Sequence, residues 1–195
     1  MTPPHYPRGP FPLCHTRATQ TTNIGMSYHG SMYPNWYAKV SAPFRSAMGT
    51  EAIRLLDRAL VLLIAVAYVV AMAFLAITDD PHFLRMLIVP AVVLVVVSAL
   101  RQAINAPRPY ELYDIDPILE KDTQGKSLPS RHVACATIIA CGLAWFHADW
   151  GVIALIAAAG VAFTRIVGGV HFPRDVIVGA ALAIVCALVG FVLIP

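Results

Sequence analysis

Residues 59–77 read ALVLLIAVAYVVAMAFLAI, nineteen residues in succession without a charged side chain. A helix needs about 20 apolar residues to cross the hydrocarbon core of a bilayer. Further uncharged stretches follow at residues 86–100, 133–146, 150–164 and 176–195. The whole chain is 58% hydrophobic and 13% charged, whereas a soluble domain is usually nearer half apolar and a quarter charged. The pattern predicts an all-α, integral-membrane helical bundle with about five transmembrane helices.

The three middle stretches are short for membrane spans, and polar residues stand at their ends. Arg101 follows the second stretch, residues 130–132 precede the third, and Arg165 follows the fourth. Helices that continue through these residues would approach spanning length. Charges at such a depth are costly and usually mark a functional site. We therefore expect the helices to include these residues and a site to lie beside them.

The N-terminal part of the chain differs in composition from the rest. Residues 1–33 are rich in Pro, Thr, His and Tyr and contain no apolar run of the kind found in secretory signals, so they are predicted to be disordered. Residues 34–195 are predicted to form one membrane-embedded domain. Within it, residues 36–58 mix basic and apolar side chains and predict an interfacial amphipathic helix before the first span. Met26 and Met32 are alternative starting residues.

Charge and cysteine content narrow the possible partners. The net charge is +3, and no dense run of Lys and Arg indicates nucleic-acid binding. Cys135, Cys141 and Cys186 lie in apolar runs, and together with Cys14 they show no metal-ligand spacing. They are interpreted as small buried apolar residues.

A first polar segment, RQAINAPRP, begins at Arg101 and contains Arg108. The two arginines are seven residues apart, about two helical turns, so they can share a helix face. Their forked donors suit phosphate oxygens. Taken alone, the segment favours instead a helix end whose arginines reach the membrane interface.

A second segment, SLPSRH, ends at His132 directly before the third span. Ser130 stands where a helix starts, and Pro129 helps to fix that start. The free N–H groups and the positive dipole end of a helix attract anions. His132 would lie in the first turn beside the same pocket. The alternative is an ordinary N-cap with an interfacial histidine.

A third segment, TRIVGGVHFPRD, joins the fourth and fifth spans. The glycines at 168–169 can end one helix, and Pro173 can open the next. His171 then lies in a tight loop. Asp175, in the first turn of the following helix, can reach back to one imidazole nitrogen and leave the other free to attack. The alternative is a polar turn with a capping aspartate.

Together the three segments resemble the type 2 phosphatidic-acid phosphatase family, which shares its site with the vanadium haloperoxidases. The family pattern is Lys or Arg, six residues and Arg-Pro; then Pro-Ser-Gly-His; then Ser-Arg, five residues, His, three residues and Asp. This chain carries all three parts in order and with the same spacing, over roughly residues 84–195. It departs at three positions, where Arg101 replaces the commoner Lys, Arg131 replaces Gly and Thr164 replaces Ser. The cation of Arg131 beside the phosphate makes a diphosphate substrate a plausible hypothesis.

The resemblance implies a phosphate-binding set. Arg101, Arg108 and Arg165 would hold the phosphate oxygens and stabilise the charge that builds on them. Ser130 and the N–H of Arg131 would add hydrogen bonds. Three arginines can neutralise the charge that a metal often neutralises, so no metal and no other cofactor is expected.

The resemblance also implies a catalytic set. His171 would attack phosphorus and form a phosphohistidine, and Asp175 would orient it. His132 would protonate the leaving lipid oxygen and later activate water.

The predicted function is hydrolysis of a lipid phosphomonoester or diphosphate at the surface of a bilayer. Candidate substrates are phosphatidic acid, phosphatidylglycerol phosphate and polyprenyl diphosphate. A lipid phosphotransferase that uses the same site is one alternative, and a non-catalytic membrane protein that binds anionic lipid is another. Binding alone needs no aspartate-oriented histidine, which argues against the last. The oligomeric state stays open.

Alternating spans predict that the polar segments gather on one membrane face. That face would hold 13 of the 14 Lys and Arg residues, and the other only Arg85. Without the arginines at 101, 108, 131 and 165, the comparison is nine against one. The positive-inside rule then favours the cytoplasmic side of a cell membrane. The N-terminal segment supplies much of this excess, so the side stays open.

Overall fold

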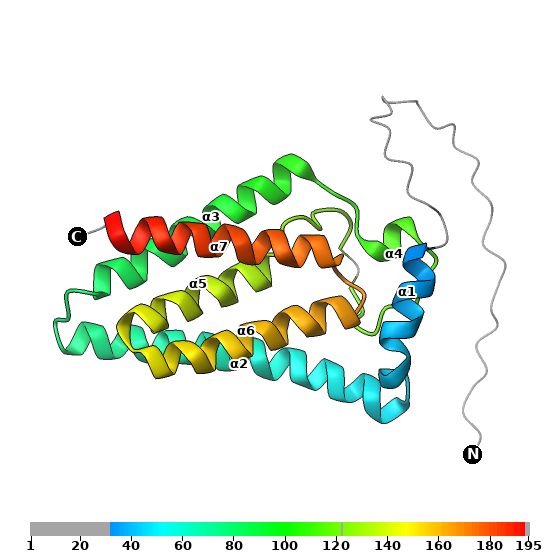
Figure 1. The fold of residues 1–195 in the computed structure, drawn as a ribbon, viewed down its shortest axis with the longest axis horizontal. Helices are drawn as coiled ribbons and strands as arrows, with labels where there is room; N and C mark the ends of the chain where they lie inside the picture. The colour runs from blue at the N-terminus through cyan, green and yellow to red at the C-terminus, as the bar shows by residue number, and fades with distance from the viewer. Residues whose placement is uncertain (1–31, 122, 194–195) are drawn as a thin grey trace, which may run out of the picture. The chain divides into compact units, whose positions relative to one another are not determined.

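A computed structural model describes residues 32–121 and 123–193, and the regular elements within these residues are all helices (Figure 1). The predicted all-α membrane bundle is confirmed. The elements are α1 (Met32–Ser41), the 3-10 helix η1 (Ala42–Phe44), α2 (Ala47–Ile77), α3 (Phe83–Ile104), α4 (Pro109–Leu112), α5 (Arg131–Phe146), α6 (Ala148–Val167) and α7 (Pro173–Leu193).

Among the described residues, four helical stretches are long and apolar enough to cross a membrane: Ala47–Ile77, Phe83–Leu112, Ala148–Val167 and Pro173–Leu193. The fifth apolar helix, α5, has 16 residues. The helices continue through the polar ends as expected, since α3 includes Arg101, α5 starts at Arg131 and α6 includes Arg165. Within the described residues, each predicted stretch therefore belongs to one helix, and Arg101, Arg131 and Arg165 lie at the ends of these helices.

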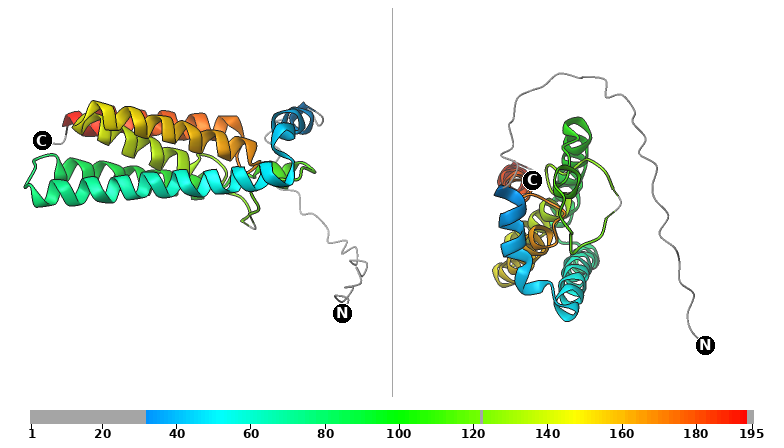
Figure 2. Two further views of the ribbon diagram at one scale, coloured as in Figure 1. Left: turned by 90° about the horizontal axis from the view of Figure 1, so that it is seen from below. Right: turned by 90° about the vertical axis from the view of Figure 1, so that its right-hand side faces the viewer.

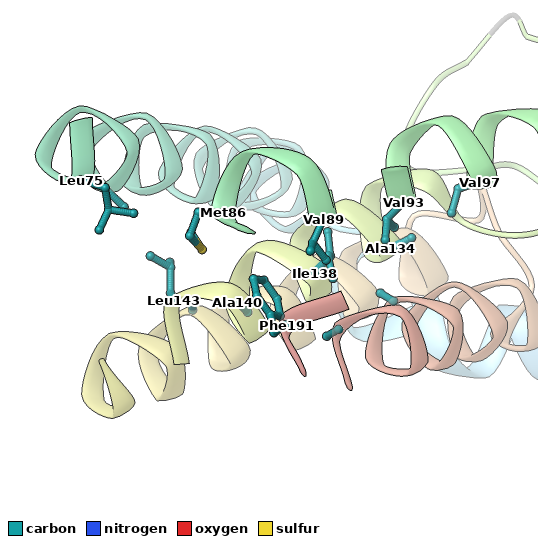
Figure 3. Close-up of a cluster of buried hydrophobic side chains, with 14 residues drawn as sticks. Leu75, Met86, Val89, Val93, Val97, Ala134, Ile138, Ala140, Leu143 and Phe191 are labelled. Atoms are coloured by element: carbon teal, nitrogen blue, oxygen red, sulfur yellow. The ribbon is translucent and has the colours of Figure 1, made fainter. Parts of the chain in front are cut away.

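Helix α5 lies at the centre of the bundle and packs against α2, α3, α6 and α7 (Figures 1 and 2). Lipid tails are as apolar as leucine, so spans associate through close van der Waals contact, which small residues permit. The buried face of α5 carries Ala134, Ala136, Ala140 and Gly142. Larger side chains from α2, α3 and α7, such as Phe191, fill the space around it (Figure 3). The central position of α5 places its N-terminus among all three polar segments.

The N-terminal region differs from the single interfacial helix predicted for residues 36–58. Helix α1 ends at Ser41, and η1 follows with Pro43 near its start. Proline disfavours a helical conformation in the residue before it and cannot donate to an earlier turn, which accounts for the break. Helix α2 restarts where the Ser46 side chain accepts a hydrogen bond from the Gly49 N–H, and it continues without interruption into the first span. Of the segment predicted to be disordered, residues 1–31 lie outside the described residues, whereas Met32 and Tyr33 belong to the first turn of α1, so the prediction is wrong for these two.

The polar loops gather at one end of the bundle, as the alternating spans predicted. Helix α1, α4 and the loops at residues 113–130 and 168–172 lie together, at the right of Figure 1. The Leu119 N–H donates to the Gly168 carbonyl at 3.0 Å, which joins the two loops. The hydroxyl of Tyr37, in α1, donates to the Val167 carbonyl at 3.1 Å. Helix α1 thus braces the end of α6 from which the second loop starts.

Candidate active site

A pocket of about 340 Å³ opens at the polar end of the bundle, where the three polar segments meet. Residues 123–126 and Lys121 contribute to its wall. The predicted site residues that line it are Arg101, Arg108, Arg131, His132 and His171. The structure therefore brings three of the four predicted arginines and both histidines of the prediction to one cavity.

The two arginines of the first segment reach this pocket by a path that the sequence did not predict. Helix α3 ends at Ile104, and Asn105 takes a left-handed conformation with φ 43°. Arg108 is the N-cap residue of α4. The shared helix face expected for Arg101 and Arg108 is therefore wrong. Asparagine tolerates the left-handed region, and Pro107 disfavours helix in the residue before it, so the chain turns between the two arginines.

Backbone carbonyl groups hold both guanidinium groups in place. Arg101 donates from Nη1 to the Pro129 carbonyl at 2.9 Å. Arg108 donates from Nε to the Gly125 carbonyl at 3.0 Å and from Nη1 to the Val170 carbonyl at 3.3 Å. A guanidinium has five N–H donors. Each arginine therefore retains donors for an anion in the pocket.

The N-terminus of α5 presents a buried hydroxyl beside the pocket residues. Ser130 is the N-cap as predicted, but its hydroxyl makes no capping bond and has no hydrogen-bond partner among the described residues. Its N–H donates to the Asp175 carbonyl at 2.9 Å. Helix α7 can come this close because Gly179 has no side chain: a Cβ there would lie 2.7 Å from the Ser130 carbonyl oxygen. An unsatisfied buried hydroxyl costs about 1–3 kcal/mol, so an anion that accepts its proton would be stabilised there.

The loop between α6 and α7 has the geometry that its glycines and proline predict. Helix α6 is capped by Gly168, and α7 starts at Pro173. Gly169 has φ 74°, a conformation that side chains rarely adopt, and a Cβ there would lie 2.6 Å from the Tyr37 hydroxyl. His171 lies in this loop and is 1% exposed. The tight turn against α1 thus fixes the imidazole at the pocket wall.

Asp175 lies behind His171, and a serine stands between them. The His171 Nδ1 is 3.7 Å from Asp175 Oδ2, which is longer than a hydrogen bond. Asp175 Oδ2 accepts hydrogen bonds from the Ser127 hydroxyl at 2.5 Å and from the Phe172 N–H at 3.0 Å. The Ser127 oxygen is 3.4 Å from Nδ1 and, having given its proton to Asp175, can accept one from Nδ1. This tautomer leaves Nε2 with its lone pair.

Sequence reasoning missed Ser127. It belongs to the second segment, but it precedes the part of the segment that matches the family pattern, and a serine in a loop carries no signal of its own. Its burial is complete, at 0% exposure. Only the fold reveals that it joins Asp175 to His171.

The environment of His171 keeps its imidazole neutral at physiological pH. Burial, with a contribution from the nearby Arg108 and Arg101 charges, lowers the pKa of His171 to about 4, although Asp175 opposes the shift. An ordinary histidine has a pKa of about 6.5. A neutral imidazole can act as a nucleophile, whereas a protonated one cannot.

The lowered pKa of His171 predicts an acid-sensitive fold. The unfolded chain takes up the proton as the pH falls below about 6.5, and the folded protein takes it up only near pH 4. Folding free energy is therefore lost progressively over this window, by roughly 3 kcal/mol in total. Denaturation of detergent-purified protein between pH 7 and pH 4 should show a steeper loss for the wild type than for His171→Gln. Parallel curves for the two proteins would contradict the shift.

Arg165 lies beside the pocket and forms a buried ion pair. Its Nη2 is 3.1 Å from Asp57 Oδ2, and the Thr164 hydroxyl donates to Asp57 Oδ1 at 2.8 Å. Asp57 and Arg165 are 7% and 4% exposed. Arg165 lines a neighbouring cleft rather than the pocket that holds His171. Asp57 lies in α2, outside the three polar segments, and binds Thr164 and Arg165 of the third segment.

Sequence reasoning also missed Asp57, although a signal was present. Asp57 follows Ile53 by four residues and precedes Ile64 by seven, and all three lie on the buried face of α2. A carboxylate on the apolar face of a span is costly without a partner. Its position therefore indicated a buried cation nearby.

Cys135, Cys141 and Cys186 are free and only partly buried, so they are less buried than predicted. Cys14 lies outside the described residues. Within residues 32–121 and 123–193, no group of three His, Cys, Asp or Glu side chains is placed to hold a metal ion.

Comparison with known families identifies the family of the chain. The model of the PAP2 superfamily matches residues 83–195, more than half of the sequence. The chain belongs to the PAP2 superfamily. The match confirms the resemblance found in the three polar segments, all of which lie within it. Helices α1 and α2, with Asp57, lie outside the part of this PAP2 protein that the family model covers.

Two solved structures are similar to this chain. LpxE of Aquifex aeolicus is 24% identical, with a TM-score of 0.65, over 80% of this chain and 93% of that one. The first transmembrane PAP2-type phosphatidylglycerolphosphate phosphatase from Bacillus subtilis is 21% identical, with a TM-score of 0.48, over 82% of this chain and 95% of that one. Comparison with curated proteins gave no match. The likeness to LpxE shows a shared fold, and this PAP2 protein is an integral membrane protein.

Proposed function

We propose that this PAP2 protein hydrolyses a lipid phosphomonoester or diphosphate through a phosphohistidine on His171. One observation carries the proposal: a buried, neutral imidazole, backed by Asp175 and Ser127, lines a pocket with Arg101 and Arg108. Binding of an anion would need the cations but not this arrangement behind the histidine. Membership of the PAP2 superfamily supports a phosphatase.

The phosphate group would sit between the arginines and the start of α5, in the pocket that holds His171, which is called the phosphate pocket below. Arg101 and Arg108 retain N–H donors on the pocket side, and the Ser130 hydroxyl lacks a partner among the described residues. The N–H of Arg131 and the dipole of α5 would add to this set. Arg165, held by Asp57, would stabilise the charge from the adjoining cleft. Donors fixed in advance stabilise the charge that develops in the transition state.

The reaction would proceed in two displacements. The His171 Nε2 lone pair attacks phosphorus, and the bond from phosphorus to the lipid oxygen breaks. His132, in its protonated form, gives a proton to that oxygen and becomes neutral. His132 then takes a proton from water, which attacks the phosphohistidine and releases inorganic phosphate and free His171.

An apolar pocket supports a lipid as the leaving group. It has a volume of about 150 Å³ and is lined by apolar side chains of α2, α5 and α6, including Ile64 and Val161. Arg131 and His132 line both this pocket and the phosphate pocket. The proposed proton donor therefore stands where a polar headgroup would meet an apolar tail. Phosphatidic acid, phosphatidylglycerol phosphate and polyprenyl diphosphate all fit this description.

The proposal also covers the cofactor requirement of the reaction and the side of the membrane on which the site lies. The site arginines would supply the positive charge, so neither a metal nor another cofactor would take part. The charge count of the sequence favours a site at the cytoplasmic side of the cell membrane.

Phosphate release in excess EDTA tests the proposed function. Detergent-purified protein should release inorganic phosphate from at least one of the three candidate lipids, at the same rate with and without EDTA. Phosphate release that stops in EDTA and returns with a divalent cation would contradict the metal-free mechanism. Loss of the donor's phosphate only when a lipid acceptor is added, with no free phosphate, would favour the phosphotransferase.

A further inference from the structure

A second polar cleft adjoins the phosphate pocket. It has a volume of about 300 Å³. Its lining residues are Arg54, Asp57, Arg58, Leu119, Glu120, Lys121 and Arg165. Lys121 also lines the phosphate pocket, so the two cavities meet at this side chain.

The two carboxylates of the cleft are already engaged. Asp57 pairs with Arg165 at 3.1 Å, and Glu120 pairs with Arg54 at 2.6 Å. Within the described residues, Arg58 and Lys121 have no hydrogen-bond or ion-pair partner. Among the described residues, the cleft therefore presents two positive charges without an ion-pair partner, next to the cavity where phosphate would be cleaved.

Of these two cations, Lys121 is the more unfavourable to leave without an anion. Its side chain is half-buried, and burial, followed by the charges of Arg165 and Arg108, lowers the pKa of Lys121 to about 8. A partly buried ammonium among other cations is unfavourable unless an anion joins it. Because Lys121 lines both cavities, an anion in the second cleft would contact it as well.

We propose that Lys121 and Arg58 form a second anion subsite, which holds a further phosphoryl group that the lipid product retains. The inference rests on the proposed function. His132, the group proposed to protonate the leaving oxygen, lines the same pocket as Lys121, and Lys121 lines the second cleft together with Arg165. The retained part of the substrate begins at that oxygen, so an anionic group close to it comes near this cleft. The preferred substrate is accordingly a lipid with two phosphoryl groups rather than phosphatidic acid.

Two kinds of lipid share this chemistry. In a polyprenyl diphosphate the retained phosphoryl group is bonded directly to the leaving oxygen. In phosphatidylglycerol phosphate it is a phosphodiester one glycerol unit away. Comparison of both with phosphatidic acid, which has a single phosphate, tests the subsite and identifies the spacing that it accepts.

The test compares kcat/KM for the three lipids at equal mole fraction in detergent micelles. Arg58→Gln is the selective variant, because Arg58 is exposed and lines only the second cleft. We expect it to lower kcat/KM for a two-phosphate lipid about fivefold, as a partly exposed ion pair contributes on the order of 1 kcal/mol, and to leave phosphatidic acid within about twofold. Lys121→Gln should lower kcat/KM for the two-phosphate substrates more strongly than Arg58→Gln does. Lys39→Gln, an exposed lysine of α1 outside both cavities, is the charge-matched control and should change none of the three.

Equal kcat/KM for all three lipids in the wild type would overturn the subsite, and so would an equal loss for all three in Arg58→Gln. Absence of hydrolysis of every lipid would mean instead that the proposed function fails. The subsite is then judged by the affinity of the His171→Ala protein for polyprenyl diphosphate and polyprenyl monophosphate. A preference for the diphosphate that Arg58→Gln removes supports it, and equal affinities overturn it.

Discussion

Replacement of His171 by alanine should lower phosphate release by at least about a thousandfold, because the proposed mechanism assigns the attack on phosphorus to this imidazole and a different role to His132. His171 lines the pocket with Arg101 and Arg108, and its Nδ1 faces Ser127 and Asp175. The measurement is phosphate release from the best lipid substrate under conditions that saturate the wild type.

His147→Ala is the matched control for this loss. His147 is exposed and lies in the turn before α6, at the opposite end of the bundle, so the variant should retain wild-type activity. His171→Asn guards against the cavity that alanine leaves, since asparagine fills more of the space without a comparable nucleophile. Retention of more than about a tenth of the wild-type rate in both His171 variants, a far smaller loss than removal of a nucleophile causes, would place the nucleophile elsewhere.

Replacement of Asp57 by alanine should be the most destabilising change among the site residues, by about 3–5 kcal/mol, because it leaves the Arg165 guanidinium buried without its carboxylate. The pair is 3.1 Å apart, and the side chains of Arg165 and Asp57 are 5% and 10% exposed. Thermal or denaturant unfolding in detergent measures the loss. Activity should fall as well, since Arg165 would no longer be held beside the pocket.

Two comparisons separate the ion pair from a general effect of the substitution. Glu51→Gln removes an exposed carboxylate from the same helix and should change stability by less than about 0.5 kcal/mol. The double variant Asp57→Ala with Arg165→Met removes both charges and should be more stable than Asp57→Ala alone. Additive losses in the double variant would show that the two side chains do not depend on each other.

Much of the fold followed from the spacing of charges along the chain. Uncharged runs predicted the spans, and the polar residues at their ends predicted where the helices continue, as Arg101 and Arg165 show. The glycines at 168–169 and Pro173 predicted the loop that carries His171. These features are local, because a few adjacent residues decide each of them.

Features that depend on distant contacts were harder to predict. The break at Pro43 divides a segment that reads as one amphipathic helix, and the left-handed Asn105 separates two arginines that helical spacing would align. Asp57 acquires its role from Thr164 and Arg165, more than one hundred residues away. The periodicity of one helix can indicate that such a residue is buried, but its partner can be identified only from the packing of α2 against α6.

A covalent phosphate on His171 is the most direct measure of the proposed mechanism. His132→Ala protein, which lacks the group proposed to activate water, should accumulate the intermediate when it is mixed with a polyprenyl diphosphate whose terminal phosphate is radioactive. The leaving group of this substrate is a phosphate, which can depart without the proton that His132 would supply. The account predicts label that is stable in alkali, labile in acid and located by peptide mapping at residue 171, with none in the His171→Ala protein. Label on another residue, or turnover without any labelled protein, would contradict a histidine nucleophile at this site.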